Sequence, residues 1–327
     1  MNGASNHLFG GIEGGGTQST IILMDSSGRS LVQYVGPSTN HYATGMEECA
    51  RRLAELVDVA LKEAGLPPNT SLKALGLCLS GCEDEATNAG LEQELRRQRP
   101  DLAELIVVAS DTLGPIATAC PRGGVVVISG TAYWIAARAV KLLIDEEDHL
   151  VDPPHPTHAL RTLVLTHFNI EDRFGMLHHC YQNFSKSFYA SLTRGIADLA
   201  TKGDVVCQQL MFDGGEALGR HVAALSRNID SSLYDPPDGL SIICVGSVWK
   251  SFELLRPGFV AGLRPRSKLD VSVPRWSLLR LKTSSALGAV YLAAKKADCD
   301  IPRDYDKNAE VIFRYSDAKC PDKAVSS

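Results

Sequence analysis

HLFGGIEGGGTQSTIILMDSSGRSLVQYVG, residues 7–36, contains three runs of apolar and β-branched residues, separated by a glycine turn and by the turn DSSGR. This pattern predicts three consecutive strands joined by tight turns before any helix appears. A Rossmann unit differs, because its glycine loop opens directly into a helix. The chain also lacks a G-x-x-x-x-G-K-[ST] motif, which excludes a P-loop.

Strands and helices alternate through the rest of the chain, which indicates an α/β protein with layered sheets. Apolar spacing predicts helices at 47–65, 85–98, 112–120 and 284–298, and from near Trp249. Residues 132–228 are predicted to be almost wholly helical, with a break at DPPHP, 152–156. Strands are predicted at 72–81, 104–111, 241–248 and within 267–282, where Pro274 weakens the pattern.

Composition limits the kinds of partner. A length of 327 residues suits about two domains, and a net charge of −5 provides no basic field for nucleic acid or anionic lipid. Apolar runs such as VVVIS and LSIICVG are too short to span a bilayer. The first residues, MNGASNHLFGG, show no basic stretch followed by an apolar one, so we expect no secretory signal.

The nine cysteines are scattered, and we interpret them as reduced thiols of a cytoplasmic protein. Cys78 and Cys244 lie within apolar runs and are predicted to be small buried hydrophobes. Three residues separate Cys78 from Cys82, but no second pair or histidine cluster supports a zinc site. His178-His179 has no partner at ligand spacing and is interpreted as structural.

Glu13-Gly14-Gly15-Gly16-Thr17 lies at the predicted tip of the first hairpin. Three glycines permit positive φ and bring backbone N–H groups close to an anion, and the Thr17 hydroxyl can donate to a phosphate oxygen. A plain glycine-rich turn is the alternative. Two glycines would suffice for a turn, so the third and its flanking residues favour a functional loop.

Three further polar features follow predicted strands. Asp111 ends a strand at the carboxyl edge where open α/β sheets bind ligands, and it could act as a general base or as the N-cap of the next helix. Ser38-Thr39-Asn40-His41 offers groups for a polyhydroxylated ligand, although loop and cap chemistry explains it equally well. Gly246-Ser247-Val248-Trp249-Lys250-Ser251 would admit a nucleotide near a helix N-terminus, or form a tight turn. Together these loops suggest phosphoryl transfer from Mg-ATP.

These motifs resemble the N-acetylglucosamine kinase family, within the sugar kinase/Hsp70/actin superfamily. The matching stretches run in order through most of the chain: GGIEGGGT, STNH, the Asp in VASDTLGPIATA, GGVVVISGT, AYWIA, GRH at 219–221, ICVGSVWKSFELL and SSALGA. The resemblance implies a two-lobed actin-like ATPase (ribonuclease H-like) α/β fold whose second lobe is largely helical. The N-terminal lobe would be residues 1–121, with the first phosphate loop and the catalytic Asp. The C-terminal lobe would be residues 122–327, with the nucleotide-side loops, and the final helix could return to the first lobe.

The resemblance also implies a role for each site residue. ATP would contact Thr17 and residues Gly14, Gly15 and Gly16 of the first phosphate loop, Thr131 of the second, and Ala190, Ser247 and Ser251 on the nucleotide side. Asn40 and His41 would hold the sugar, and Asp111 would be the base for its 6-hydroxyl. Mg²⁺ would accompany ATP, and Glu13 is a weaker candidate for a position near it. Family members are typically homodimers, and some also phosphorylate muramyl dipeptide.

One departure from the family falls at residues 125–143, VVVISGTAYWIAARAVKLL. In the family, SGT continues into a hairpin and a Gly-Gly-Trp-Gly segment before Ala-Tyr-Trp begins, whereas Ala132 follows Thr131 at once here. Both flanks are intact, which favours a clean internal excision over gradual drift. Losing a hairpin would expose a sheet edge or leave part of the core unfilled.

Two alternatives to an active kinase remain at this point. A non-catalytic nucleotide-binding or dimerising variant would keep GGGT and GSVWKS but lack turnover. An ATPase that activates a partner enzyme through an iron–sulfur cluster would need a cysteine at a shared cluster site, and the scattered cysteines of this chain do not favour that.

Overall fold

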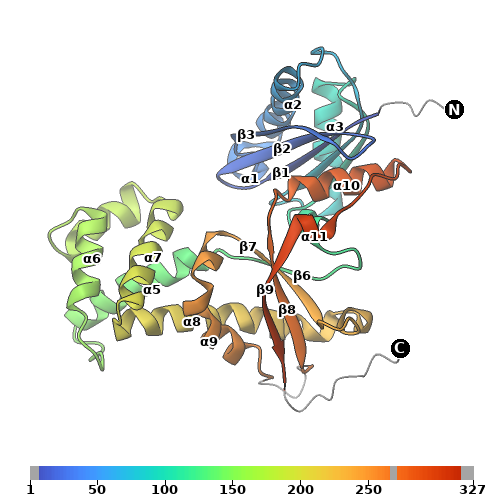
Figure 1. Cartoon of the computed structure of the whole chain (residues 1–327). Coiled ribbons are helices and arrows are strands. Elements are labelled where there is room, and N and C mark those ends of the chain that lie inside the picture. The colour runs from blue at the N-terminus through green and yellow to red at the C-terminus, as the bar shows by residue number, and fades with distance from the viewer. Residues whose placement is uncertain (1–6, 266–270, 318–327) are drawn as a thin grey trace. The chain divides into compact units, whose positions relative to one another are not determined.

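The computed structural model describes residues 7–265 and 271–317 (Figure 1). The chain divides into two compact units. In the described part, unit 1 comprises the residues up to Val126 together with Leu240–Ile243 and Ser277–Arg314. Unit 2 comprises Val127–Gly239, Cys244–Trp276 and the residues from Tyr315 onward. Among the described helices, none is long and apolar enough to cross a membrane.

Unit 1 is built on a five-stranded sheet of order β3-β2-β1-β4-β5. Its strands are β1 (Leu8–Gly14), β2 (Gln18–Asp25), β3 (Ser30–Pro37), β4 (Leu72–Leu79) and β5 (Ala103–Ser110). The first three strands are antiparallel neighbours, while β4 runs parallel to both β1 and β5. The predicted three-stranded meander is therefore confirmed.

Both faces of this sheet are buried, because successive side chains of its strands enter different apolar clusters. Ile21 and Leu23 of β2 share one cluster with α2 (Met46–Glu63) and α3 (Glu85–Gln98). Ile22 and Met24 share the other with α10 (Ala286–Lys296). Figure 1 shows α2 and α3 on one side of the sheet and α10 on the other. Three shorter helices complete the unit: α1 (His41–Thr44), α4 (Leu113–Ala119) and α11 (Tyr305–Asn308).

Helix α10 lies unusually close to β1, β4 and α4. A Cβ atom added to Gly11 of β1 would meet the backbone of Ala286 and Val290, and one added to Gly76 of β4 would meet the carbonyl of Ala289. The absence of side chains at these glycines lets the helix backbone pack directly on the sheet.

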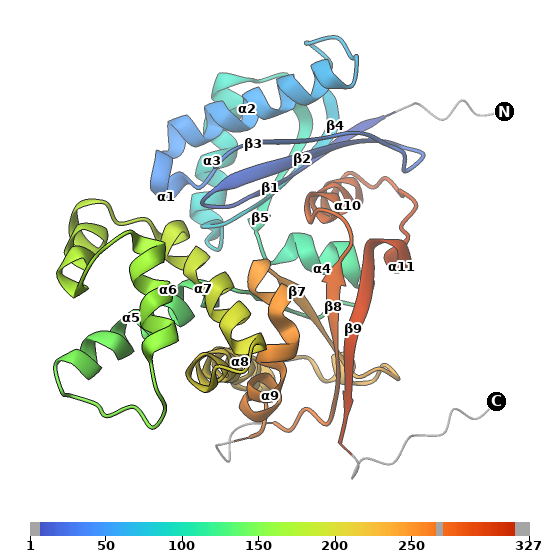
Figure 2. The same cartoon turned by 60° about the vertical axis from the view of Figure 1, so that its left-hand side comes forward.

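Unit 2 is largely helical, as predicted. Its longer helices are α5 (Thr131–Glu147), α6 (His158–Phe168), α7 (Lys186–Thr201), α8 (Val205–Leu225) and α9 (Phe252–Gly262). Short 3-10 or π segments are η1 (Arg173–Gly175), η2 (His178–Gln182), η3 (Ser226–Asn228), η4 (Ser231–Tyr234) and η5 (Ser247–Ser251). The break at 152–156 is confirmed, and α8 and α9 lie side by side (Figures 1 and 2). The helix predicted from near Trp249 begins later, at Phe252, because a 3-10 segment precedes it.

A second sheet has the order β6-β7-β8-β9. Its strands are β6 (Val125–Ile128), β7 (Leu240–Val245), β8 (Arg275–Leu281) and β9 (Ala309–Ser316). Strand β8 begins directly after Pro274, where the missing N–H removes no bond from the strand itself. The predicted strand range 267–282 is thus confirmed from 275 onward, while its residues 267–270 lie outside the described part. The sequence did not predict β9.

Candidate functional site

The carboxyl ends of three neighbouring strands meet in register in unit 1. Gly14 of β1 pairs with Leu79 of β4, and Leu79 pairs with Ser110 of β5. The Ser80 N–H then donates to the Gly14 carbonyl at 2.8 Å, and the Asp111 N–H donates to the Leu79 carbonyl at 3.1 Å. Asp111 therefore lies at the carboxyl edge of the sheet, as predicted, and the glycine loop leaves the same edge two strands away, after β1.

The glycine loop joins β1 to β2 through a bond from the Gly15 N–H to the Gln18 carbonyl at 3.1 Å. None of Gly14, Gly15 and Gly16 has a positive φ angle, so the expectation that these residues adopt such angles is wrong. Gly14 is instead required by packing, because a Cβ there would meet Thr39 and Leu79. A Cβ on Gly16 would meet nothing within 4 Å. Since neither packing nor φ demands Gly16, its missing side chain leaves backbone N–H groups of the loop open to a ligand.

Hydrogen bonds bring the loop at residues 38–41 beside this glycine loop. The Ser38 hydroxyl donates to the Gly15 carbonyl at 2.8 Å, and the hydroxyls of Thr39 and Ser19 lie 2.8 Å apart. Asn40 Oδ1 accepts from the Tyr42 N–H at 2.9 Å and so caps α1. The capping interpretation is therefore correct for this oxygen, while Asn40 Nδ2 lies 3.5 Å from the Ser80 hydroxyl.

His41 is the most unusual polar side chain of this loop. It is 8% exposed, and its Nδ1 atom has no hydrogen-bond partner among the described residues. Its ring lies against Tyr42, with the two ring centroids 4.3 Å apart. An unpaired buried polar atom costs about 1–3 kcal/mol, so a ligand group that completed this bond would bind favourably.

Asp111 is held in a partly buried, negatively charged setting. Burial raises the pKa of its carboxyl above the ordinary value, the charges of Glu83 and Glu13 raise it further, and hydrogen bonds from Ser110 and Ser80 partly offset the rise. The alternative of an N-cap is wrong, because Thr112 occupies the N-cap position of α4 and makes no side-chain cap bond. A carboxylate of raised pKa at a sheet edge is suited to accept a proton.

In unit 2, the loops after β6 and β7 lie next to each other. The Ser129 N–H donates to the Val245 carbonyl at 2.9 Å, and Gly246 adopts a φ of 113° beside Ser129. Thr131 is the first residue of α5, and its N–H donates to the Ser129 hydroxyl at 3.2 Å. Two residues therefore separate the end of β6 from α5, as the sequence around Thr131 indicates.

The start of α5, helix α7 and segment η5 surround a pocket of about 560 Å³. Three predicted residues, Ala190, Ser247 and Ser251, line it together, and Ala132 places the pocket directly beside Thr131. The sequence assigns no individual role to the remaining lining residues, which are Val248 and Lys250 of the predicted nucleotide loop at 246–251 and, on α7, Ser191, Thr193, Arg194, Ala197 and Asp198. One pocket is thus lined both by the loop after β7 and by a face of α7. On that face, Ala190 is the one residue that the sequence predicts to contact the nucleotide.

Two cations of this pocket are its most informative additions. Arg194 and Lys250 are exposed, and neither forms an ion pair with another residue in the described part of the chain. Arg194 lies one turn after Ala190 on the same face of α7. Within η5 the neighbouring Trp249 is buried instead, with its Nε1 donating to the Val127 carbonyl at 3.3 Å. Trp249 thus anchors η5 in the protein, while the polar side chains of η5 line the pocket.

The histidines and cysteines predicted to be structural are hydrogen-bonded or buried within the protein. His179 Nε2 lies 3.0 Å from the Phe168 carbonyl, and His178 Nδ1 lies 2.9 Å from Gln182 Oε1. Cys78 and Cys244 are buried, as predicted.

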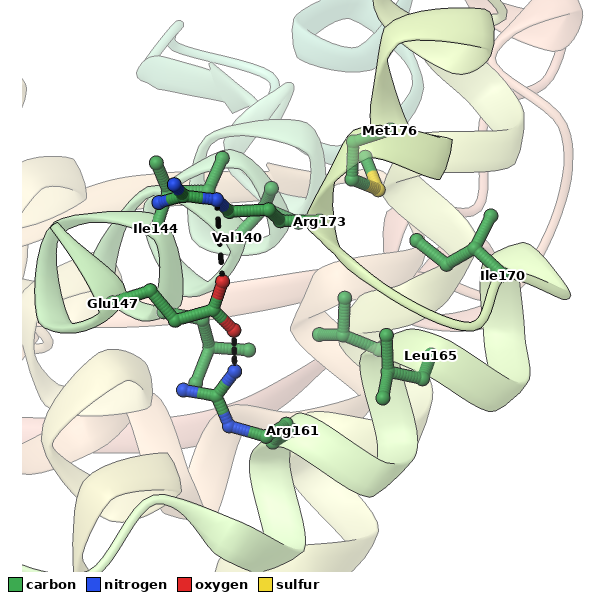
Figure 3. Close-up of a pocket in the computed structure, with 10 residues that line it drawn as sticks. Val140, Ile144, Glu147, Arg161, Leu165, Ile170, Arg173 and Met176 are labelled. Carbon is green, nitrogen blue, oxygen red and sulfur yellow. Dashed lines mark ion pairs between the residues drawn. The ribbon is translucent and has the colours of Figure 1, made fainter.

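A second pocket of unit 2 is too small for a substrate. Figure 3 shows Glu147 of α5 between the guanidinium groups of Arg161 and Arg173, beside apolar side chains that include Leu165 and Met176. Glu147 forms ion pairs with both arginines, the one to Arg173 at 3.6 Å. The volume of about 20 Å³ corresponds to about one water molecule, so we interpret this feature as packing between helices.

No family model matches the chain. The sequence is 21% identical over 321 residues to the N-acetylmuramic acid/N-acetylglucosamine kinase of Clostridium acetobutylicum, a match that covers 89% of this chain and 98% of that kinase. The fold is similar to that of a proposed N-acetylglucosamine kinase from Chromobacterium violaceum, with a TM-score of 0.64, 21% identity, and coverage of 88% of this chain and 99% of the other.

A ROK family glucokinase from Streptomyces griseus, solved with glucose and AMPPNP, has a TM-score of 0.51 and 14% identity over 88% of this chain and 99% of its own. These matches span nearly the whole length of the relatives. The α/β fold of the actin-like ATPase type, predicted from the sequence, is therefore confirmed.

Proposed function

We propose that this chain is an ATP-dependent sugar kinase that phosphorylates the 6-hydroxyl of N-acetylglucosamine, as in amino-sugar salvage. The observation that carries the proposal is Asp111, a partly buried carboxylate of raised pKa at the sheet edge where the glycine loop and residues 38–41 also end. The relatives of the chain, which include an N-acetylmuramic acid/N-acetylglucosamine kinase, support the same reaction class.

Unit 1 supplies the acceptor side of this reaction. Asp111 would take the proton of the attacking sugar hydroxyl as a general base. Asn40 Nδ2 and the unpaired Nδ1 of His41 would bind other polar groups of the sugar. These side chains would hold the bound sugar in one orientation. The attacking hydroxyl would then lose less entropy on reaching the transition state.

Unit 2 supplies groups that fit ATP. A volume of about 560 Å³ lies within the range of about 300–1,000 Å³ typical of ligand sites. Arg194 and Lys250 would bind phosphate oxygens, with further hydrogen bonds from Ser247 and Ser251. Within unit 1, the open N–H groups around Gly16 and the exposed Thr17 are further candidate groups for binding phosphate.

Mg²⁺ would neutralise the phosphate charge of bound ATP. The described residues contain no group of three acidic, histidine or cysteine side chains that could hold a metal by themselves. Mg²⁺ would not need such a group, because it usually keeps several waters and binds through one or two carboxylates and substrate phosphates.

The direct test measures ADP release from Mg-ATP with and without N-acetylglucosamine, and then with muramyl dipeptide, which we propose as a further acceptor. Sugar-dependent release supports the kinase. Nucleotide-induced thermal stabilisation with no response to any sugar would rule out the kinase and leave a nucleotide-binding protein.

Substituting the pocket cations should weaken nucleotide binding. We expect Arg194→Ala and Lys250→Ala each to raise the KM for ATP about tenfold, because each removes a charge-assisted hydrogen bond to phosphate. Lys202→Ala, which removes an exposed cation near the end of α7 outside the pocket, is the matched control and should leave the KM unchanged. Equal KM values for all three variants would place the phosphates elsewhere.

A non-catalytic nucleotide-binding or dimerising variant is the second candidate. The observation that favours it is the direct passage from β6 through Ser129 and Gly130 into α5, which leaves little chain for a phosphate loop. We propose that this junction results from an internal excision, and that the chain forms a homodimer in either case. A tryptic peptide crossing residues 130–138 of endogenous protein would test the junction, and light scattering would test the dimer.

A further inference from the structure

The side chain of Glu13 is committed to the first turn of α10. Its Oε2 accepts a hydrogen bond from the Ser284 hydroxyl at 3.0 Å, another from the Ser285 hydroxyl, and a third from the Ala286 N–H at 3.1 Å. Ser285 occupies the N-cap position of α10 but makes no capping bond through its own side chain. Glu13 therefore caps this helix from a strand 272 residues away in the sequence.

A carboxylate is well suited to this position. The first N–H groups of a helix have no partner within the helix, and the N-terminal end carries a partial positive charge that favours an anion. Lys295 and Lys296 at the other end of α10 complement the opposite partial charge. These features make the contact with Glu13 stronger than a bond between neutral groups.

The helix that Glu13 caps is firmly placed. Its backbone packs directly on Gly11 of β1, on Gly76 of β4 and, through Gly288, on the Gly114 carbonyl of α4. Glu13 is the next-to-last residue of β1, so the glycine loop begins within two residues of this anchored side chain. A fixed Glu13 thus fixes the starting point of residues 14–17.

We propose that Glu13 is a positioning residue, which binds the first turn of α10 and thereby holds the glycine loop in the conformation that binds phosphate. This inference rests on the proposed function, because it assumes that the loop binds a nucleotide. It differs from a place for Glu13 at the metal ion, since here the carboxylate acts through protein hydrogen bonds.

The test measures ADP affinity by calorimetry, once in EDTA and once in excess Mg²⁺, for wild type, Glu13→Ala, Glu13→Gln and the double variant Ser284→Ala/Ser285→Ala. In EDTA we expect Glu13→Ala and the double variant to bind ADP roughly tenfold more weakly than wild type, a factor that corresponds to about 1.4 kcal/mol. Glu13→Gln should bind ADP more tightly than Glu13→Ala but less tightly than wild type, because its amide oxygen can accept the same hydrogen bonds as Oε2 yet lacks the negative charge. In kinetics, Glu13→Ala should raise the KM for ATP more than it lowers kcat.

Glu104→Gln is the control, because it changes an exposed carboxylate on β5 that pairs only with Lys73 among the described residues. A loss seen only with Mg²⁺ and shared by Glu13→Gln would overturn the inference in favour of a metal role. Equal affinity of all variants in EDTA would overturn it as well. Failure of wild type to bind ADP would instead refute the proposed function, so the two failures are distinguishable.

Discussion

Asp111→Asn is expected to abolish sugar-dependent ADP release, lowering kcat by about 10²–10⁴-fold, the usual contribution of a general base. The amide keeps the size of the carboxylate but cannot accept the proton of the attacking hydroxyl. Nucleotide binding should persist, because the predicted nucleotide groups lie on other elements. The measurement is steady-state ADP release, together with the thermal shift that ADP induces. A variant that retains full activity would remove Asp111 from the reaction.

The same substitution should not lower the melting temperature near neutral pH. Burial raises the pKa of Asp111 in the folded state above its value in the unfolded chain. Its stabilising contribution is therefore complete below the unfolded pKa and is lost as the pH rises through the folded pKa. At neutral pH the ionised carboxylate gives no such benefit, and a neutral amide of the same size avoids its burial cost. Loss of activity without loss of stability would distinguish a functional carboxylate from a structural one.

Activity should also fall in acid at a higher pH than for an ordinary aspartate, because the base must be ionised to act. The charged groups responsible are Glu83 and Glu13, which add to the effect of burial. Glu83→Gln is expected to move the acid limb of the kcat/KM profile to lower pH. An unmoved limb would mean that another group titrates.

The parts of the fold that the sequence predicted depend on local rules. The meander at residues 7–36 follows from alternating apolar runs with Gly and Asp turns. The end of α2 follows from Gly65, which has a φ of 70° and donates to the Lys62 carbonyl at 3.0 Å, while the Leu66 N–H donates to the Leu61 carbonyl at 2.9 Å. This Schellman arrangement uses only neighbouring residues, so the sequence contains all the information needed.

Features that the sequence missed depend on distant partners. Strand β9 is mostly half-exposed or exposed, so its pattern resembles a polar segment until β8 pairs with it. Arg194 resembles a solvated helix cation, and only the loop after β7 makes it part of a pocket. The partners of Glu13 at residues 284–286 lie at the other end of the chain, so the sequence alone does not indicate that this carboxylate caps a helix. Long-range pairing decides each of these cases.

Gly76→Ala is expected to destabilise unit 1 by about 1–3 kcal/mol, the usual cost of overpacking a core. The added Cβ would meet the Ala289 carbonyl of α10, and backbone atoms cannot rotate away as the end of a flexible side chain can. The measurement is the free energy of unfolding in urea. Gly90→Ala is the matched control, since a Cβ at Gly90 in α3 meets nothing within 4 Å. Gly90→Ala should instead raise the free energy of unfolding by at most about 1 kcal/mol, because alanine favours a helix.

The same change at Gly76 connects packing to binding. A methyl group between β4 and α10 pushes the helix from the sheet, and this movement displaces the N–H and hydroxyl groups that Glu13 accepts from. Gly76→Ala should therefore weaken ADP binding as well as stability, whereas Gly90→Ala should change stability alone. If Gly76→Ala lost stability but bound ADP as wild type does, α10 would stabilise the sheet without holding the loop. Loss of both stability and ADP affinity would instead show that the close packing of α10 on Gly76 supports ligand binding as well as the core.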